Sequence, residues 1–298
     1  MPNPSFTSIN PKEVSVPAFH HFMLGAVAPR PIAFASTIDL QGRVNLSPFS
    51  FFNAFGANPP TLIFSPARRV RDNTTKHTHQ NVLEVPEVVI HIVDYAMVEQ
   101  MSLSSCEYPK EVNEFVKAGF EAIPSTMVRP PRVASAPAAF ECKVTQVIET
   151  GTEGGAGNLI ICEVLLAHFR NDILGSDGKI DTTKLDAVGR MGGDWYVRAH
   201  GEALFEVAKP NLKLGVGVDA LPEPIRLSKV LTGNHLGKLG NEERLPEPTQ
   251  VEAFKQTETF KHYRAQAGSS MEKAHQIAAK LLDAGKLNES WLWLLSHY

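Results

Sequence analysis

Apolar and polar residues alternate with a period of two along several short stretches in the first two thirds of the chain. Residues 32–38, 61–65 and 87–94 are rich in β-branched and aromatic side chains. Two longer stretches with the same alternation, residues 138–149 and 159–169, follow a proline-marked connection. This period predicts β-strands with one buried face, so we expect a mainly β structure whose last two strands form a hairpin.

Apolar residues at helical spacing appear between these strands and again toward the C-terminus. The side chains of Asp72 and Asn73 are suited to cap a helix that runs toward Leu83. The other predicted helices cover residues 18–24, 96–105, 108–119, 249–266, 269–284 and 288–297. The helices between strands would lie around the sheet, and the last three would form a helical C-terminal region.

The composition of the chain changes beyond Pro210. Residues 218–248 are interrupted by proline and glycine and show little periodicity. Such a segment is expected to wrap irregularly over a surface rather than to form a core of its own. We therefore expect two parts, a mainly β domain over residues 1–210 and a C-terminal extension over residues 211–298.

The two ends of the chain differ from its middle. Residues 1–18 hold four prolines and few large apolar side chains, which predicts an extended arm. The C-terminal end is apolar and contains Trp291 and Trp293. Such a tail predicts docking on the chain's own β domain or on a second subunit.

Composition and charge narrow the class of protein. Of 298 residues, 43% are hydrophobic and 20% are charged, which is typical of a globular protein with a sizeable core. The formal net charge of −3 argues against a general electrostatic grip on nucleic acid or on an anionic membrane. The N-terminus has no signal-peptide pattern and no apolar run reaches the roughly 18 residues of a membrane span, so we expect a cytoplasmic protein.

The potential metal ligands form no recognisable site. Cys106, Cys142 and Cys162 lie far apart and make neither a CxxC pair nor a disulfide framework. His77 and His79 alternate as ligands on one strand face would, but no third ligand accompanies them. We therefore predict no metal site.

The segment between the first two predicted strands carries the first candidate chemistry. Residues 45–53 read NLSPFSFFN, in which short polar side chains are interleaved with phenylalanines. A flat ring with polar edges could use both kinds of side chain. The same pattern also fits a β-hairpin whose aromatic side chains simply fill a core.

A basic stretch, ARRVRDNTTKHTHQN, begins just after Pro66. Guanidinium groups, hydroxyls and backbone N–H groups placed before a helix are suited to bind a phosphate monoester. A solvated charged surface would show the same composition. The later glycine-rich segment, residues 151–157, lacks the Lys-Ser/Thr of a P-loop and precedes a strand, which favours a mobile hairpin turn.

The runs PRPIAFAST, DLQG, NLSPFSFFN, NPP and RVRDNTT occur in this order, and GRMGGDWY follows at residues 189–196. In order and approximate spacing they resemble the flavin reductase-like family of FMN-binding split barrels, over roughly residues 19–210. The resemblance implies an antiparallel split β-barrel with peripheral helices. It also implies a flavin site built at a two-fold interface, and hence a homodimer.

The resemblance further implies which residues bind FMN. Thr37 and residues 45–53 would meet the ring and the ribityl chain, and the basic stretch would meet the phosphate. The implied cofactor-binding residues are Thr37, Asn45, Ser47, Phe49, Ser50, Phe51, Asn53, Arg68, Arg71, Thr74, Thr75 and Lys76. The basic stretch is longer than the compact Lys-Asp-Thr pattern of the family, so the choice of residues within it stays open. GRMGGDWY would lie beside the flavin or at the dimer contact, and His168 is a candidate for the nicotinamide side.

The resemblance implies an oxidoreductase. The first hypothesis is an NAD(P)H-dependent flavin reductase that transfers hydride from NADH or NADPH to FMN. The second is an FMN-binding electron-transfer protein, similar to flavoredoxin, which a partner protein reduces. The third is a non-catalytic scaffold whose C-terminal helices bind another protein. Because flavin itself carries the redox chemistry, no catalytic residue is assigned.

Overall fold

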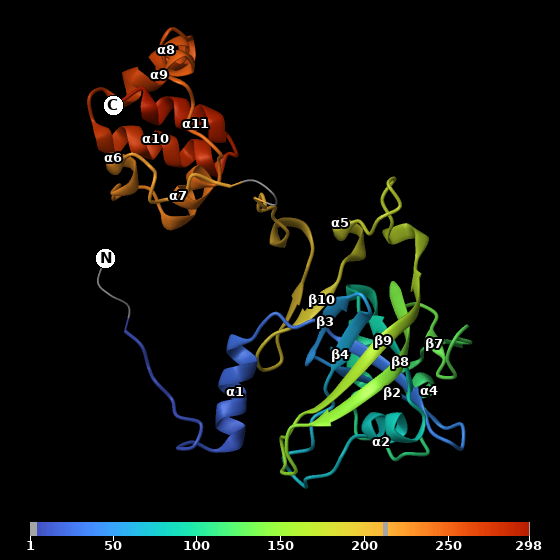
Figure 1. Cartoon of the computed structure of the whole chain (residues 1–298). Coiled ribbons are helices and arrows are strands. Elements are labelled where there is room, and N and C mark those ends of the chain that lie inside the picture. The colour runs from blue at the N-terminus through green and yellow to red at the C-terminus, as the bar shows by residue number, and fades with distance from the viewer. Residues whose placement is uncertain (1–4, 211–213, 298) are drawn as a thin grey trace. The chain divides into compact units, whose positions relative to one another are not determined.

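The computed structural model describes residues 5–210 and 214–297. The chain divides into two compact units, Met1–Phe205 and Glu206–Tyr298 (Figure 1). The predicted boundary between residues 210 and 211 falls beside residues 211–213, which lie outside the described residues.

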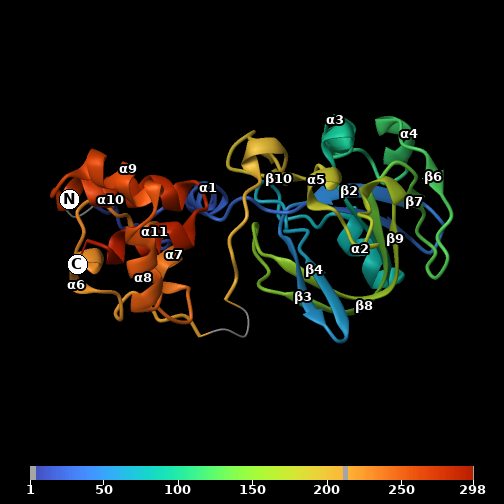
Figure 2. The same ribbon diagram turned by 90° about the horizontal axis from the view of Figure 1, so that it is seen from above.

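A seven-stranded sheet forms the first unit, in the order β2-β1-β5-β8-β9-β4-β3. All neighbouring strands are antiparallel, and the turned view in Figure 2 shows the helices α2, α3 and α4 around them. This arrangement confirms the predicted mainly β fold class. The strands of the sheet are β1 Ala33–Ile38, β2 Val44–Phe49, β3 Phe52–Ala57, β4 Pro60–Phe64, β5 Glu87–Ile92, β8 Ala138–Glu149 and β9 Asn158–Phe169.

Smaller elements surround this sheet. Two short hairpins join β6 Ala122–Ile123 to β7 Arg132–Val133, and β10 Val188–Arg190 to β11 Tyr196–Arg198. The helices of the unit are α1 Val16–Ala26, α2 His77–Glu84, α3 Val98–Leu103, α4 Glu114–Ala118 and α5 Thr182–Leu185. Three 3₁₀ turns lie at Tyr95–Met97, Asn171–Ile173 and Gly201–Ala203.

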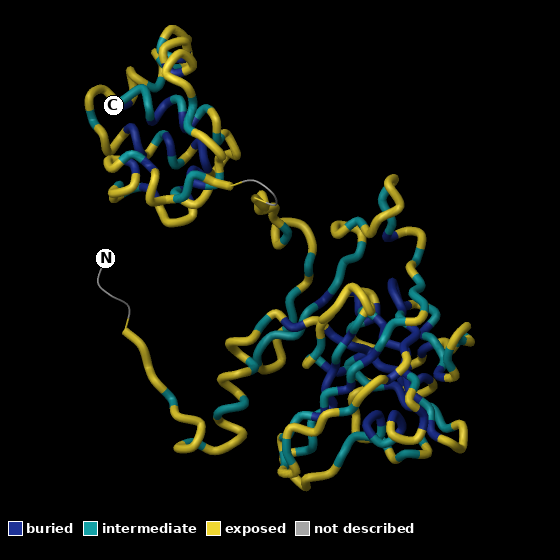
Figure 3. Tube along the Cα trace, in the orientation of Figure 1, coloured by how far each residue is buried: buried dark blue, intermediate teal, exposed yellow. Residues whose placement is uncertain are grey.

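The core of this unit lies on both faces of β1. Phe34 belongs to one buried cluster with Met101 and Phe115, whereas Ala35 belongs to a second cluster with Phe64. Figure 3 shows buried residues gathered in the middle of the first unit. Because successive side chains of a strand point to opposite faces, the two clusters explain why residues 33–37 of this strand are all buried.

Residues 45–53, which were expected to connect the first two predicted strands, lie largely in strands themselves. They form most of β2 and the start of β3, with a break at Ser50 and Phe51. Pro48 lies inside β2, which is tolerated because β2 is an edge strand of the sheet. Ser47 and Pro48 are residue types that are common in loops, but here they lie in an edge strand of the sheet.

The predicted cap of α2 is also wrong. The helix begins at His77 with Lys76 as its N-cap residue, and the Asp72 side chain instead accepts hydrogen bonds from Thr74. Asn73 has a positive φ of 56°, so these residues close a turn ahead of the helix.

Other helix boundaries shift. The helix expected over residues 108–119 is shorter, Glu114–Ala118, and the left-handed Gly119 ends it. The helix expected over 96–105 is a 3₁₀ turn followed by α3. The expected extended arm is shorter than residues 1–18 because α1 begins at Val16, and residues 1–4 lie outside the described part.

The second unit is helical and has its own core, which corrects the expectation of a segment without one. Its helices are α6 Glu223–Arg226, α7 Gly233–Gly240, α8 Pro248–Lys255, α9 Glu258–Ala267, α10 Met271–Asp283 and α11 Leu287–Leu295. Trp291 and Trp293 are almost fully buried, together with Ile225 and Leu239 from the stretch that was expected to be irregular. The tryptophans of the C-terminal end therefore pack within this unit.

Candidate functional site

A cavity of about 320 Å³ opens in the first unit. The end of β2 and the break before β3 form one wall, from Ser47 to Phe51. Other walls come from α1, from Arg30, and from the turn between β10 and β11. The lining residues are His20, Leu24, Arg30, Ser47, Pro48, Phe49, Ser50, Phe51, Ser65, Ala67, Lys76, Ser105, Arg190, Met191 and Gly193.

A smaller polar recess of about 20 Å³ shares Ser47, Lys76 and Ser105 with this cavity. It is lined almost wholly by polar side chains, from β2, from the start of α2 and from the segment between α3 and α4. The lining residues are Asn45, Ser47, Arg69, Lys76, His77, Thr78, Ser104, Ser105, Cys106, Glu107, Tyr108 and Glu114. The site thus has a part with aromatic walls and an adjoining polar part.

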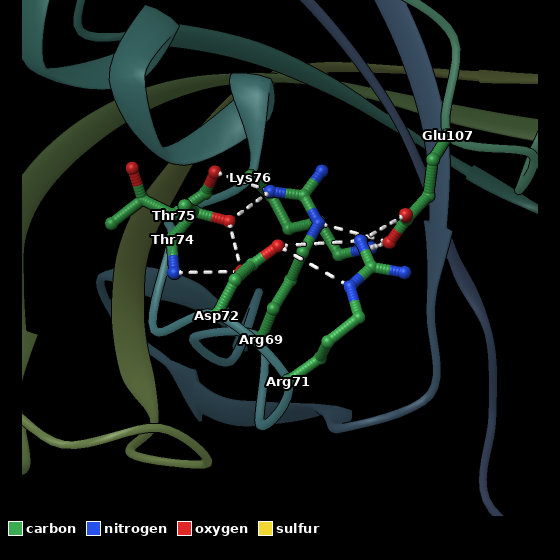
Figure 4. Close-up of polar contacts among 7 residues, drawn as sticks. All are labelled: Arg69, Arg71, Asp72, Thr74, Thr75, Lys76 and Glu107. Carbon is green, nitrogen blue, oxygen red and sulfur yellow. Dashed lines mark hydrogen bonds and ion pairs between the residues drawn. The ribbon is translucent and has the colours of Figure 1, made fainter.

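Three cations meet beside this recess (Figure 4). Arg69 Nε lies 2.9 Å and Lys76 Nζ 3.8 Å from Glu107 Oε1, and Arg71 Nη2 lies 2.6 Å from Glu107 Oε2. Burial, and then the charge of Arg69, lowers the pKa of Lys76. An added anion would therefore favour the charged form of this lysine.

The loop that carries the cations is braced internally. Arg69 Nη1 donates to Thr74 Oγ1 and to the carbonyl oxygen of Thr75, at 2.8 and 2.9 Å. Hydrogen bonds from Thr74, more than the neighbouring Arg71, lower the pKa of Asp72 to about 2. Asp72 is therefore ionised at neutral pH and holds Thr74 in place for Arg69.

The N-terminus of α2 adds backbone donors to the recess. Its N-cap residue, Lys76, makes no side-chain capping bond, and its first turn contains no acidic residue. His77 and Thr78 of this turn line the recess, and the Thr78 hydroxyl accepts a hydrogen bond from Asn45 at 2.8 Å. Uncapped N–H groups at a helix start favour an anion.

Arg30 organises the opposite side of the cavity and was not among the predicted site residues. The residue is 5% exposed, and its guanidinium donates to the carbonyl oxygens of Leu24, Val27 and Met191. It thereby joins the end of α1 to the β10–β11 turn. Burial, and then the nearby Arg190, lowers the pKa of Arg30.

The predicted residues fall into two groups. Half of them line the cavity or the recess, namely Asn45, Ser47, Phe49, Ser50, Phe51 and Lys76. The others line neither and are Thr37, Asn53, Arg68, Arg71, Thr74 and Thr75. The residues of the site that the sequence analysis did not select include Arg30, Arg69, Ser105 and Glu107.

The residues outside the cavity have identifiable partners. Thr37 is buried and accepts a hydrogen bond from Asn81 at 3.2 Å. Arg68 Nε donates to Asn73 at 2.7 Å, and Asn53 accepts from the N–H of Ala54. Thr37 and Arg68 therefore brace the surroundings of the site in this structure.

His168 lines neither the cavity nor the recess. Its Nε2 lies 2.7 Å from Oε1 of Glu141, which is fully buried and also accepts from the backbone N–H groups of Thr126 and Met127. This arrangement ties β8, β9 and the preceding connection together. The expected position on the nicotinamide side stays a prediction.

Within residues 5–210 and 214–297, no group of three His, Cys, Asp or Glu side chains is arranged to hold a metal ion. None of the helices there has the length and apolar character needed to span a membrane.

Comparison with known proteins shows which sequences and structures are similar. The sequence model described as "Flavin reductase like domain" matches residues 24–183. A protein of Aquifex aeolicus is 38% identical over 196 residues, which is 66% of this chain and 97% of that protein. Nitrilotriacetate monooxygenase component B from Bacillus cereus has a similar crystal structure, with a TM-score of 0.64 and 29% identity over 69% of this chain and 100% of that one. The 2-nitrobenzoate 2-nitroreductase of Pseudomonas fluorescens gives a TM-score of 0.60 and 26% identity, over 68% and 96% of the two chains.

Proposed function

Since the chain belongs to the flavin reductase-like family, we propose that it is an FMN-binding oxidoreductase that accepts hydride from NADH or NADPH. The observation that carries this proposal is the pairing of a cavity with aromatic walls and a basic recess, which share Ser47, Lys76 and Ser105. A ring joined by a short chain to a phosphate needs such a pair of adjoining sites. The named relatives, a monooxygenase component and a nitroreductase, are consistent with redox chemistry.

The residues present suit each part of FMN. About 320 Å³ lies in the usual range of small-molecule pockets, and Phe49 and Phe51 offer apolar surface for a flat ring. Arg69, Lys76 and the uncapped start of α2 offer charged and backbone donors for a phosphate. We therefore favour Arg69 and Lys76 as phosphate ligands over Arg68, which donates to Asn73.

In this proposal the protein binds the flavin, orients its ring and leaves one side of the ring accessible to the electron donor. A bound flavin would supply the redox chemistry, by accepting a hydride and passing electrons to an acceptor. Arg30 fixes the relative position of α1 and the β10–β11 turn, and so sets the width of the cavity. Ser47 and Ser50 line the cavity, and their hydroxyls could form hydrogen bonds that orient the polar edge of a ring.

We also propose that the active form is a homodimer. Strand β3 is an edge of the sheet, five of its six residues are exposed, and Phe55 is 64% exposed. Helix α1 borders the cavity, yet it has no buried residue and exposes Phe22 and Met23. An unpaired edge and an apolar helix are both surfaces that a second copy would cover.

Absorbance of the purified protein with and without added FMN, followed by anaerobic titration, tests the proposed activity. We expect FMN to bind and NADH or NADPH to bleach the flavin absorbance near neutral pH. Bound flavin that only a reduced partner protein bleaches would instead indicate an electron carrier. A protein that binds no flavin and consumes no nicotinamide would refute both forms of the proposal.

A further inference from the structure

Glu107 is an anion already seated in the basic recess. Both of its carboxylate oxygens are engaged, Oε1 by Arg69 and Lys76 and Oε2 by Arg71. Figure 4 shows this side chain reaching the cations from a different segment of the chain. Hydrogen bonds from Arg71 and Arg69 lower the pKa of Glu107, so the carboxylate is charged at neutral pH.

We propose that Glu107 holds the position of the phosphate in the ligand-free protein, and that a phosphate monoester must displace it in order to bind. This inference rests on the proposed function, because FMN is the phosphate ligand expected here. It makes Glu107 a determinant of specificity, since the glutamate competes with the phosphate and not with the ring.

Space is the first argument. The recess measures about 20 Å³, close to the room that one water molecule needs, with Glu107 as part of its wall. A phosphate group needs more than this. Arg69 is the least exposed of the three cations, with 17% of its side chain accessible, and Glu107 covers its Nε. A phosphate can therefore bind the Nε of Arg69 only if the Glu107 carboxylate moves away.

Charge is the second argument. Arg69, Arg71 and Lys76 carry three positive charges, and Asp72, which stays ionised, offsets one of them. The remaining two charges match a phosphate monoester, which carries about −1.5 to −2 at neutral pH. With Glu107 still in place, only one positive charge would remain for the phosphate. Among these loop residues and Glu107, the charge therefore matches a phosphate only when the glutamate has moved out. Burial raises the pKa of Glu114, the other acid that lines the recess, which favours its neutral form.

The segment that carries Glu107 allows such a movement. Glu107 lies in the connection between α3 and α4, where residues 107–109 have no helix or strand, and 43% of its side chain is exposed. The carboxylate can therefore reach water by a change of side-chain rotamer, and solvation offsets part of the lost ion pairs.

The test compares Glu107→Gln with the wild type and with Glu111→Gln. Glu111 is exposed and lies four residues away, so its replacement removes the same charge outside the cluster. Calorimetric titration with inorganic phosphate is the first readout, and fluorescence titration with FMN and with riboflavin is the second. We expect Glu107→Gln to lower the dissociation constants of phosphate and FMN at least tenfold, whereas riboflavin binding and the Glu111→Gln protein stay within about twofold of the wild type.

The outcomes separate this inference from the proposed function. Tighter phosphate binding by Glu107→Gln without any FMN binding would refute the proposed function and support the displacement. Unchanged or weaker phosphate binding by this variant, or no phosphate binding by any of the proteins, would overturn the displacement. Hydrogen exchange of the wild type gives a check that needs no variant. Phosphate should speed exchange in residues 104–108, and unchanged or slower exchange there would contradict the inference.

Discussion

His91 gives a prediction whose magnitude follows from the structure. The side chain lies fully buried on β5 between two backbone groups, with Nδ1 2.8 Å from the carbonyl oxygen of Phe34 and Nε2 2.9 Å from the N–H of Val133. A carbonyl only accepts and an N–H only donates, so the ring is neutral with its proton on Nδ1. Burial is the main reason that the pKa of His91 falls from 6.5 to about 4.

The sign of the pH dependence follows from this direction. Below pH 6.5 the unfolded chain takes up a proton at His91, whereas the folded chain does so only near pH 4, so acid favours unfolding. The shift of about 2.5 units corresponds to a loss of about 3 kcal/mol once both states are protonated, of which about 2 kcal/mol is lost between pH 7 and pH 5. Well above pH 6.5 this contribution is fully present.

The assay compares the wild type with His91→Gln, whose amide can donate to Phe34 and accept from Val133 without titrating. Amide exchange of peptides covering β5, Glu87–Ile92, at increasing urea reports the unfolding free energy of the first unit apart from the second. The unfolding free energy of the wild type minus that of His91→Gln should fall by about 2 kcal/mol from pH 7 to pH 5. If this difference in unfolding free energy is the same at both pH values, the proposed buried, neutral state of His91 is wrong.

Two further predictions concern the proposed site and its assembly. Arg69→Ala should raise the FMN dissociation constant at least tenfold, since a charged hydrogen bond is worth about 1.5 to 3 kcal/mol, whereas Arg68→Ala should change it less than threefold; equal losses in fluorescence titration would contradict this choice. Phe55→Lys should reduce the mass measured by light scattering from twice 32.7 kDa to the monomer value, and Leu40→Lys, at an equally exposed position, should not. A wild-type protein that is already monomeric would refute the dimer.

Strands with a strong two-residue period were predictable to within one or two residues. Strand β8 has the bounds expected from the sequence, and β9 begins only one residue earlier, at Asn158. Strand β3 was missed because its apolar side chains, including Phe55, are not buried in this unit. An exposed edge strand leaves no alternation of buried and exposed positions for the sequence to display.

The second unit shows a limit of a different kind. Helices α10 and α11 were expected, but the single helix expected over residues 249–266 is divided into α8 and α9. The contributions of Ile225 and Leu239 to the core of the unit were not expected. These residues lie on α6 and α7, which are only four and eight residues long. Helices this short give too few turns for an apolar face to show in the sequence. In the structure a capping box between Thr232 and His235 begins α7, with His235 in the place where the usual sequence motif has Glu or Gln.

Long-range partners account for the site residues that the sequence did not reveal. Arg69 and Arg71 lie in the basic stretch, yet the acid that gathers them is Glu107, more than 30 residues away. Arg30 donates a hydrogen bond to the carbonyl oxygen of Met191, which lies 161 residues later in the chain. The composition of residues 67–81 suits a phosphate site, but only the folded chain shows that Arg69 lines the recess and that Arg68 does not.

The glycine-rich turn between β8 and β9 explains how Arg68 and Arg69 come to differ. The N–H of Arg68 donates to the carbonyl oxygen of Ala156 at 2.8 Å, so this turn runs along the basic loop. A Cβ at Gly154 would lie 3.0 Å from the carbonyl oxygen of Val70 and 3.1 Å from that of Arg69. A glycine at this position therefore lets the two backbones approach closely without a shift, which explains the residue without a phosphate contact. Arg68 is fixed against this support, and Arg69, the next residue along the loop, is the one presented to the recess.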